Sequence, residues 1–320
     1  MRAVRYHDYG GPEVLTVDDA ETPEPRHDEA VVDVAAAAVN PVDTYFRSGA
    51  YRAAGLPMTT GVDGAGDVVA VGEDVDSYAV GDRVVATGLS RNHQGACAEQ
   101  AAVPTDRLAA LPDGADTRQA GAMGVVAVTA YRALIDDGGL DPAEDVLIHG
   151  GSGGVGHVAV QIGATTGANV VTTAAPEYHG AVAGLGADTV LDYARDDLAD
   201  AVADATDGGP DVVLDHRLDD YLSFDAEVAA RDARIVGIGE NDHAAGFEDV
   251  GRARAKDLTL RFTSMFNTPS LARVLDRCAG LLAGDGLRVE IAREYGLDGV
   301  VAAHRAVMDE SFLGKLVVVP

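Results

Sequence analysis

The 320-residue sequence carries 52 aspartate and glutamate residues against 24 lysine and arginine residues, a formal net charge of −28. Such a charge repels nucleic acid and anionic membranes and excludes both as partners. Hydrophobic residues make up 47% of the chain, which is enough for the cores of two domains and excludes wholesale disorder. No apolar run reaches the roughly 18–20 residues that span a bilayer, and the N-terminus lacks the apolar core of a signal peptide. We therefore expect a soluble, cytoplasmic protein.

The acidic residues are dispersed along the chain, and only two lysines occur, Lys256 and Lys315. A dispersed acidic surface is typical of proteins adapted to high salt, where screening suppresses repulsion between carboxylates. We therefore expect a halophilic source. The two cysteines, Cys97 and Cys278, lie far apart and form no metal-binding spacing, so we expect two buried free thiols.

The N-terminal part of the chain reads as short strands separated by turns. Ala30–Val39 is a nearly continuous apolar run broken by Asp33, and it predicts a strand in a small barrel-like sheet. Further strands are expected at 68–72 and 82–86, each ending near a glycine or a polar turn. Short strands at short spacing predict an antiparallel, β-rich domain.

From residue 120 onward, strands and helices alternate, which predicts a doubly wound α/β fold with a parallel sheet and helices on both faces. A helix at 271–282 and a last strand at 316–319 follow. The expected helices are 120–134, 154–166 and 181–185, and the expected strands are 145–149, 169–173, 189–191, 211–214 and 234–238.

A glycine-rich turn stands between the expected strand 145–149 and the expected helix 154–166. It contains the pattern G-x-G-x-x-G as Gly151, Gly153 and Gly156. In a strand–turn–helix setting, the first glycine permits the tight turn, the second lets the backbone approach a diphosphate, and the third allows close packing of helix on strand. The diphosphate then binds to free amides at the helix N-terminus. We therefore expect a dinucleotide site formed by Gly151, Ser152, Gly153, Gly154, Val155 and Gly156.

The end of the next strand discriminates between NADH and NADPH. An enzyme specific for NAD places an acidic residue there to hold the ribose hydroxyls, whereas this strand ends at Thr173 and Ala174 without an acid. Because a carboxylate would repel a 2′-phosphate, the sequence favours NADPH. No arginine or lysine follows directly, so Thr173, Tyr178 and His179 are the expected hydrogen-bond donors to that phosphate.

In these features the sequence resembles the medium-chain dehydrogenases/reductases, in the zinc-independent, zeta-crystallin-like quinone oxidoreductase branch. The resemblance implies a GroES-like β-rich domain, residues 1–122 and 266–320, into which a Rossmann dinucleotide-binding domain, residues 123–265, is inserted. The segments that carry it, in order, are 40–49, 61–66, 81–84, 95–99, 129–131, the glycine turn, 186–188, 303–304 and 314–317.

Zinc-dependent relatives carry a cysteine and a Gly-His-Glu segment as metal ligands. Here Asn40 stands at the cysteine position, Val62 and Asp63 replace the His-Glu pair, and the four-cysteine lobe of a structural zinc is missing. Because zinc needs about four well-placed ligands, the sequence predicts that no metal is bound.

Without a metal, another donor must stabilise the negative charge that develops on the substrate oxygen. The resemblance implies that Asn40 donates an amide hydrogen to the nicotinamide carboxamide or to the substrate oxygen. It also implies that Tyr51 donates its hydroxyl or stacks on a flat ring. For Asp43 two roles stay open: a catalytic role, or a structural role in which its carboxylate bonds to the loop amides. Arg47 is expected to be a solvated loop arginine, with a cation for the developing enolate as the alternative. Further cofactor contacts implied by the resemblance are Thr129, Tyr193 and Lys315.

The expected function is reduction of a quinone or a conjugated enone by NADPH through metal-free hydride transfer. Two alternatives stay open: enoyl-thioester reduction, and a structural or sensor protein that binds NADPH with little turnover. The segment Asp215–Asp220 replaces a glycine pair that relatives carry near the nicotinamide, so the identity of the substrate is left open. The resemblance also implies a homodimer.

Overall fold

The computed structural model describes residues 1–320, which form two compact units. The β-rich unit comprises 1–128 and 269–320, and the parallel-sheet unit comprises 129–268. The domain boundaries expected from the sequence, at 122–123 and 265–266, stay a prediction. No helix combines the length and the apolar character needed to cross a bilayer.

The β-rich unit contains a seven-stranded sheet with the order β15-β16-β3-β5-β6-β8, and β7 also pairs with β3. A second, three-stranded sheet has the order β2-β1-β4. The strands are β1 (Arg2–Tyr6), β2 (Leu15–Asp19), β3 (Glu29–Val39), β4 (Met58–Thr59), β5 (Asp63–Val71), β6 (Arg83–Ala86), β7 (Gln100–Pro104), β8 (Leu108–Ala110), β15 (Ile291–Tyr295) and β16 (Lys315–Val318).

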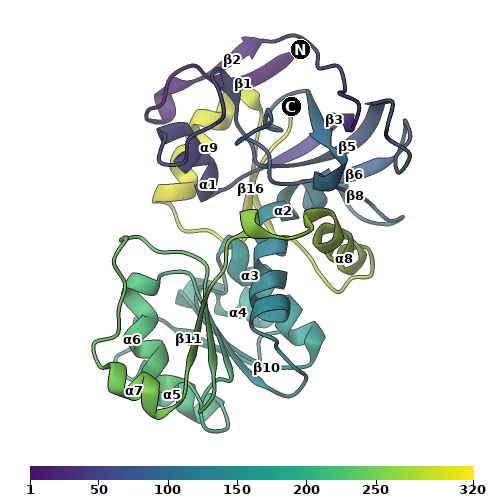
Figure 1. The fold of residues 1–320 in the computed structure, drawn as a ribbon. Helices are drawn as coiled ribbons and strands as arrows, with labels where there is room; N and C mark the ends of the chain where they lie inside the picture. Colours follow the sequence, from purple (N-terminus) through teal and green to yellow (C-terminus); the bar gives the residue numbers. More distant parts are fainter. The chain divides into compact units, whose positions relative to one another are not determined.

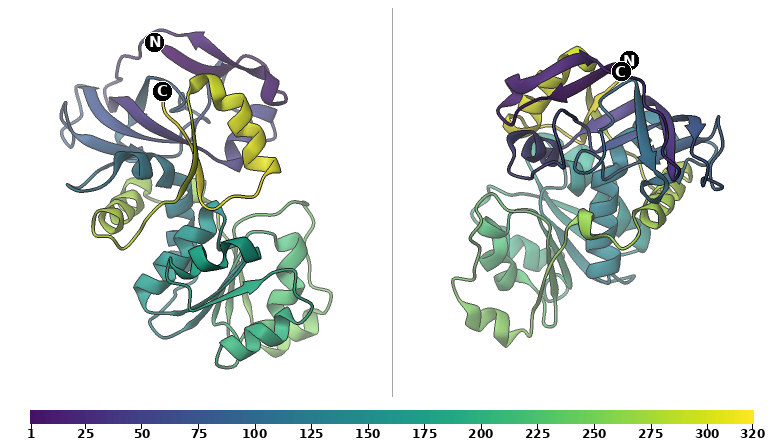
Figure 2. Two further views of the ribbon diagram at one scale, coloured as in Figure 1. Left: turned by 180° about the vertical axis from the view of Figure 1, so that it is seen from behind. Right: turned by 45° about the horizontal axis from the view of Figure 1, so that its top comes forward.

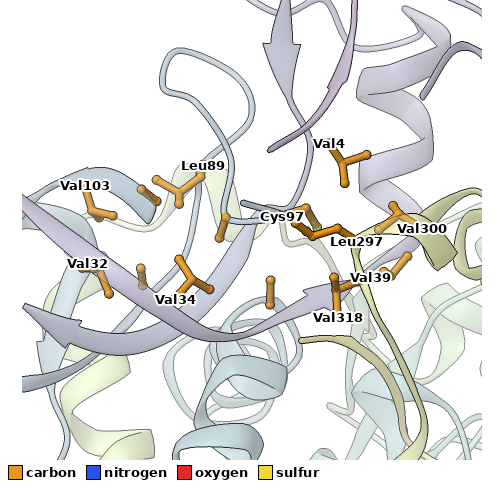
Figure 3. Packing of buried hydrophobic residues seen from close by; sticks show 14 of the residues in the cluster. Val4, Val32, Val34, Val39, Leu89, Cys97, Val103, Leu297, Val300 and Val318 are labelled. Carbon is orange, nitrogen blue, oxygen red and sulfur yellow. The ribbon is translucent and has the colours of Figure 1, made fainter. Parts of the chain in front are cut away.

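The core of this unit packs residues from both ends of the chain against β3 (Figure 3). Val34 and Val39 of β3 lie in one buried cluster with Val318 of β16 and with Val300 of α9 (Val300–Asp309). Because these side chains are almost fully withdrawn from water, their burial stabilises the unit by about 1.5–3 kcal/mol per residue. The C-terminal strand is therefore an integral part of the β-rich unit.

The other helices of this unit are α1 (Pro41–Ser48), α8 (Leu271–Ala283) and, up to residue 128, α2 (Thr117–Tyr131). The expected helix 271–282 and the expected strands at 30–39, 68–72, 82–86 and 316–319 are confirmed, with ends shifted by a few residues. Cys97 and Cys278 are buried and free, as expected.

The parallel-sheet unit has one six-stranded sheet with the order β11-β10-β9-β12-β13-β14, in which every pair is parallel. Figures 1 and 2 show α3 and α4 on one face of this sheet and α5, α6 and α7 on the other. The elements are β9 (Asp145–Ile148), α3 (Gly154–Thr166), β10 (Asn169–Ala174), α4 (His179–Ala183), β11 (Thr189–Asp192), α5 (Leu198–Ala205), β12 (Val212–Asp215), α6 (Leu218–Val228), β13 (Arg234–Gly237), α7 (Val250–Ala255) and β14 (Thr259–Phe262).

This arrangement confirms the expected doubly wound α/β fold. The chain leaves β9 toward β10 and β11, then returns to β12 on the other side of β9. In an open sheet, the point where the strand order reverses is where ligands bind, outside the carboxyl ends of the strands. The turn after β9 lies at this switch point.

One expectation about this unit needs correction, and one strand was missed. The helix expected over 120–134 ends at Tyr131 and continues as a π-helix, Arg132–Asp137. The sequence also gave no expectation for the edge strand β14, whose Phe262 is 70% exposed. An exposed strand of four residues lacks the apolar alternation on which strand prediction depends.

Candidate functional site

The glycine turn after β9 is crowded and is hydrogen-bonded to the end of β10. The amide of Gly151 donates to the carbonyl of Thr173 at 2.7 Å, and the amide of Gly150 donates to the hydroxyl oxygen of Thr173 at 3.0 Å. A Cβ on Gly156 would lie 2.0 Å from the carbonyl oxygen of Gly150. Only glycine therefore fits at position 156, as expected for the position that sets the packing of helix on strand.

The N-terminus of α3 offers unpaired backbone donors beside this turn. Gly153 is the N-cap residue and provides no side-chain cap, and the first hydrogen bond of α3 runs from His157 to Gly153. The amides of Gly154, Val155 and Gly156 therefore have no acceptor within the helix. Together with the dipole of a 13-residue helix, they form a site suited to a diphosphate.

The carboxyl end of β10 carries the residues expected near an adenosine ribose. Thr173 and Ala174 are buried, and the carbonyl of Ala174 lies 3.1 Å from Nε2 of His179. Tyr178 is partly exposed. Ala174 pairs with Asp192 of β11, so Tyr193, which is 52% exposed, begins its loop at the same edge of the sheet.

In the β-rich unit, three buried polar side chains form a network around Asn40. The side-chain nitrogen Nδ2 of Asn40 donates to Oδ2 of Asp63 at 2.9 Å, and the ammonium of Lys315 donates to Oδ1 of Asn40 at 2.5 Å. Oδ1 of Asp63 accepts from the hydroxyl of Thr87 at 2.5 Å and from the amide of Val125 at 2.9 Å. The structure therefore places Lys315 against Asn40, and the cofactor contact expected for Lys315 stays a prediction.

Asp43 holds the loop in which Asn40 lies. Its two carboxylate oxygens accept the backbone amides of Asn40, at 2.8 Å, and of Val62, at 2.9 Å. The backbone amide of Asp43 donates in turn to the backbone carbonyl of Asn40 at 3.0 Å, at the start of α1. Because both oxygens of Asp43 are bonded to loop amides, this geometry favours the structural role among the two that the sequence left open.

The buried charges of this network alter one another's protonation. Burial raises the pKa of Asp43 to about 7, although the amide of Asn40 opposes this shift, and burial also raises the pKa of Asp63. Burial lowers the pKa of Lys315 to about 8, against the attraction of Asp63 and Asp43. The ammonium of Lys315 is thus the positive charge that balances the carboxylates here.

The remaining expected residues occupy separate places. Tyr51 is 48% exposed, and its ring meets those of Tyr45 and Phe46 edge-on. Thr129 lies in α2 and is buried. The expectation of a solvated Arg47 is wrong: this residue is 7% exposed, on the buried face of α1, and its Nε donates to the carbonyl of Gly10 at 3.2 Å.

Sequence reasoning missed a buried acid cluster beside the glycine turn. Nε2 of His149, the residue after β9, lies 2.8 Å from Oδ1 of Asp225, and the ring of His149 stacks on Tyr221 with centroids 4.4 Å apart. Burial raises the pKa of Asp215 to about 7 and that of Asp225 to about 8, and each carboxyl shifts the pKa of the other. Burial lowers the pKa of His149 to about 4, so its ring is neutral.

Asp225→Asn is expected to flatten the pH dependence of stability. The folded carboxyl keeps its proton up to about pH 8, whereas in the unfolded chain it loses the proton near pH 4. Stability is therefore lost as the pH rises between these values. In urea unfolding, the fall in the free energy of unfolding between pH 6 and pH 9 should be smaller in the variant by about 1–3 kcal/mol.

The matched control is Asp219→Asn. Asp219 accepts the amides of Asn241 and Asp242, which lower its pKa, so this variant should change the pH dependence of stability only in acid and leave the slope between pH 6 and pH 9 unchanged. If the free energy of unfolding of Asp225→Asn changed between pH 6 and pH 9 as much as that of wild type, a raised pKa of Asp225 would be contradicted.

The residues at the metal positions of zinc-dependent relatives do not fit a zinc ion. Asp63 already accepts from Asn40, Thr87 and Val125, and the ammonium of Lys315 would repel a cation placed beside Asn40. No three or more histidine, cysteine, aspartate or glutamate side chains are grouped so that they could hold a metal ion.

Comparisons with known proteins agree with this architecture. Residues 26–127 match the alcohol dehydrogenase GroES-like domain family, and residues 185–318 match the zinc-binding dehydrogenase family. The quinone oxidoreductase of Lama guanicoe is 34% identical over 327 residues, covering 99% of this chain and 97% of that protein.

Two solved structures cover the whole chain and are themselves wholly covered. An Escherichia coli quinone oxidoreductase complexed with NADPH is 27% identical, with a TM-score of 0.89. An NAD-dependent alcohol dehydrogenase is 28% identical, with a TM-score of 0.92. The chain therefore belongs to the quinone oxidoreductase branch of the medium-chain dehydrogenase/reductase superfamily.

Proposed function

We propose that this protein reduces a quinone or a conjugated enone with NADPH, by hydride transfer without a metal. The observation that carries the proposal is the glycine turn, where Gly156 leaves no room for a Cβ and the first amides of α3 are unpaired. In the proposed reaction these amides bind the diphosphate. NADPH, when bound, supplies a hydride from C4 of its nicotinamide.

The polar network of the β-rich unit supports the substrate half of the proposal. Asn40 is buried and its amide donates to Asp63 through one of its two hydrogens. The second hydrogen is suited to a substrate oxygen, on which negative charge develops as the hydride is transferred. Tyr51, which is half exposed, is proposed to pack against the flat ring of the substrate.

Two findings support NADPH over NADH. The carboxyl end of β10 has no acidic residue to hold the ribose hydroxyls, and the E. coli relative was solved with NADPH. We propose that Thr173, Tyr178, His179 and Tyr193 form the surroundings of the 2′-phosphate. Thr129 as a further cofactor contact, the homodimer and the cytoplasmic location remain proposals of the same kind.

Steady-state oxidation of NADPH with a panel of quinones and enones tests this function. We expect turnover with at least one of them, and at least about tenfold higher kcat/KM with NADPH than with NADH. Crotonyl-coenzyme A in the same panel tests the enoyl-thioester alternative. Tight NADPH binding without turnover on any compound would instead favour a structural or sensor protein.

An acidic residue at the end of β10 should reverse the cofactor preference. From the sequence alone, Ala174→Asp is the variant of choice. In the structure Ala174 is only 1% exposed, so an aspartate there would be buried, whereas Ala175 is partly exposed. We therefore expect Ala175→Asp to reduce the affinity for NADPH at least about tenfold through charge repulsion, with the affinity for NADH kept or raised. Ala175→Asn is the uncharged control in fluorescence titrations. An equal loss with both cofactors would show that this strand end is not beside the phosphate.

A further inference from the structure

The side-chain amide of Asn40 is held in one orientation by partners of opposite charge. A lysine ammonium can only donate a hydrogen bond and a carboxylate can only accept one. Lys315 therefore selects Oδ1 of Asn40, and Asp63 selects Nδ2. If the amide were flipped, its NH2 group would face the ammonium of Lys315 and its oxygen would face the carboxylate of Asp63.

The register of the sheet brings these partners to Asn40 from both sides. Strand β3 ends at Val39 and lies between β16 and β5. Leu316 of β16 pairs with Val39, and Asp63 of β5 pairs with Ala38. The two charged residues are thus fixed one on each side of the end of β3.

Each partner is itself held in place. The ammonium of Lys315 donates a second hydrogen bond to the carbonyl of Val39 at 3.0 Å. The backbone amide of Lys315 donates to the backbone carbonyl of Glu290 at 2.8 Å. Asp63 is held by Thr87 and Val125. Both charged side chains are at most 3% exposed, so water does not compete for these bonds. The remaining hydrogen of the Asn40 amide therefore points in a fixed direction.

We propose that Lys315 and Asp63 are positioning residues, which hold the Asn40 amide with its second N–H directed at the substrate oxygen. This inference rests on the proposed function, in which Asn40 is the donor to that oxygen. A donor fixed before the reaction needs no reorganisation when the charge develops, which is why such donors accelerate a reaction strongly. Lys315 then acts on turnover through Asn40.

Three variants separate this role from simple charge balance. Lys315→Met keeps an unbranched side chain one atom shorter but removes the ammonium, so Asn40 Oδ1 loses its donor and Asp63 loses its counter-charge. Asp63→Asn removes the acceptor. The double variant has no net buried charge at the two positions, and the amide introduced at position 63 favours a reversed Asn40.

In Lys315→Met, kcat for an enone or quinone should fall at least about tenfold, with the Kd for NADPH within about twofold of wild type. The double variant should regain the thermal stability lost in the single variants but not the kcat. The proposal is overturned if Lys315→Met keeps kcat within twofold, or if the double variant regains kcat together with stability. Should Lys315→Met fail to fold, the charge-balanced double variant decides on the same criterion.

A measurement without turnover keeps this inference distinct from the proposed function. In nitrogen-15 spectra, the side-chain signals of Asn40, identified by their loss in Asn40→Ala, should be protected from exchange with water in wild type. In Lys315→Met they should exchange at least about tenfold faster, since the amide is no longer held. Unchanged exchange would overturn the positioning role, whereas a wild type with protected signals and no turnover would overturn only the proposed function.

Discussion

Gly156→Ala is expected to reduce the affinity for NADPH at least about 100-fold, which is roughly 2.7 kcal/mol. The added Cβ would lie 2.0 Å from the carbonyl oxygen of Gly150 and 3.0 Å from Cα of Gly151, so the turn has to move. Any such shift carries the first amides of α3 away from the position at which they bind the diphosphate. Fluorescence or calorimetric titration with NADPH measures the loss.

A second variant separates binding from folding. Gly153→Ala places a Cβ 3.2 Å from the Gly150 carbonyl, and the φ of −71° at Gly153 is accessible to alanine. This variant should fold and still bind NADPH at least about tenfold more weakly, because the Cβ occupies the space for the diphosphate. Gly280→Ala in α8, where a Cβ meets nothing within 4 Å, is the matched control. Wild-type affinity in both turn variants would contradict the proposed diphosphate site.

The midpoint of thermal unfolding is expected to be at least about 10 °C higher in 2 M KCl than in 0.1 M KCl. A net charge of −28 on 320 residues opposes the compact state through self-repulsion. The Debye length falls from about 10 Å to about 3 Å or less over this range of salt, so the repulsion is screened. For a chain of this size, such a shift corresponds to roughly 3 kcal/mol or more.

Charge-neutralising variants test whether screening is the cause. Asp200 and Asp204 are both exposed on α5, one turn apart, so they repel each other. The double substitution Asp200→Asn/Asp204→Asn should raise the unfolding midpoint in 0.1 M KCl and leave it unchanged in 2 M KCl. Equal midpoints of the wild-type protein at both salt concentrations would contradict adaptation to salt.

Features set by local sequence were predicted well. The helix 154–166 and the strands on either side of it follow from apolar periodicity and from the glycines of the turn, which act within a few residues. The alternation of strand and helix predicted the parallel sheet with helices on both faces, but it did not predict the order of the strands.

Features that depend on pairing between strands far apart in the sequence were not predicted. Asp63 and Lys315 meet Asn40 only because β5 and β16 flank the end of β3, and no local pattern indicates that. In the sequence, Asp63 was considered only as one residue of an incomplete set of zinc ligands. Lys315 was assigned to the cofactor because of the family resemblance. Arg47 was misplaced for a similar reason, since the short helix α1 that buries it was not expected.

Transfer of deuterium from C4-deuterated NADPH to a conjugated enone tests the central claim most directly. The reaction is run with protein dialysed against a chelator, and the product is analysed by mass spectrometry and NMR. We expect one deuterium on the β-carbon, where it cannot exchange with water, and a rate within twofold of that of untreated protein. Product without this deuterium, or activity lost on chelation and restored by zinc, would contradict metal-free hydride transfer.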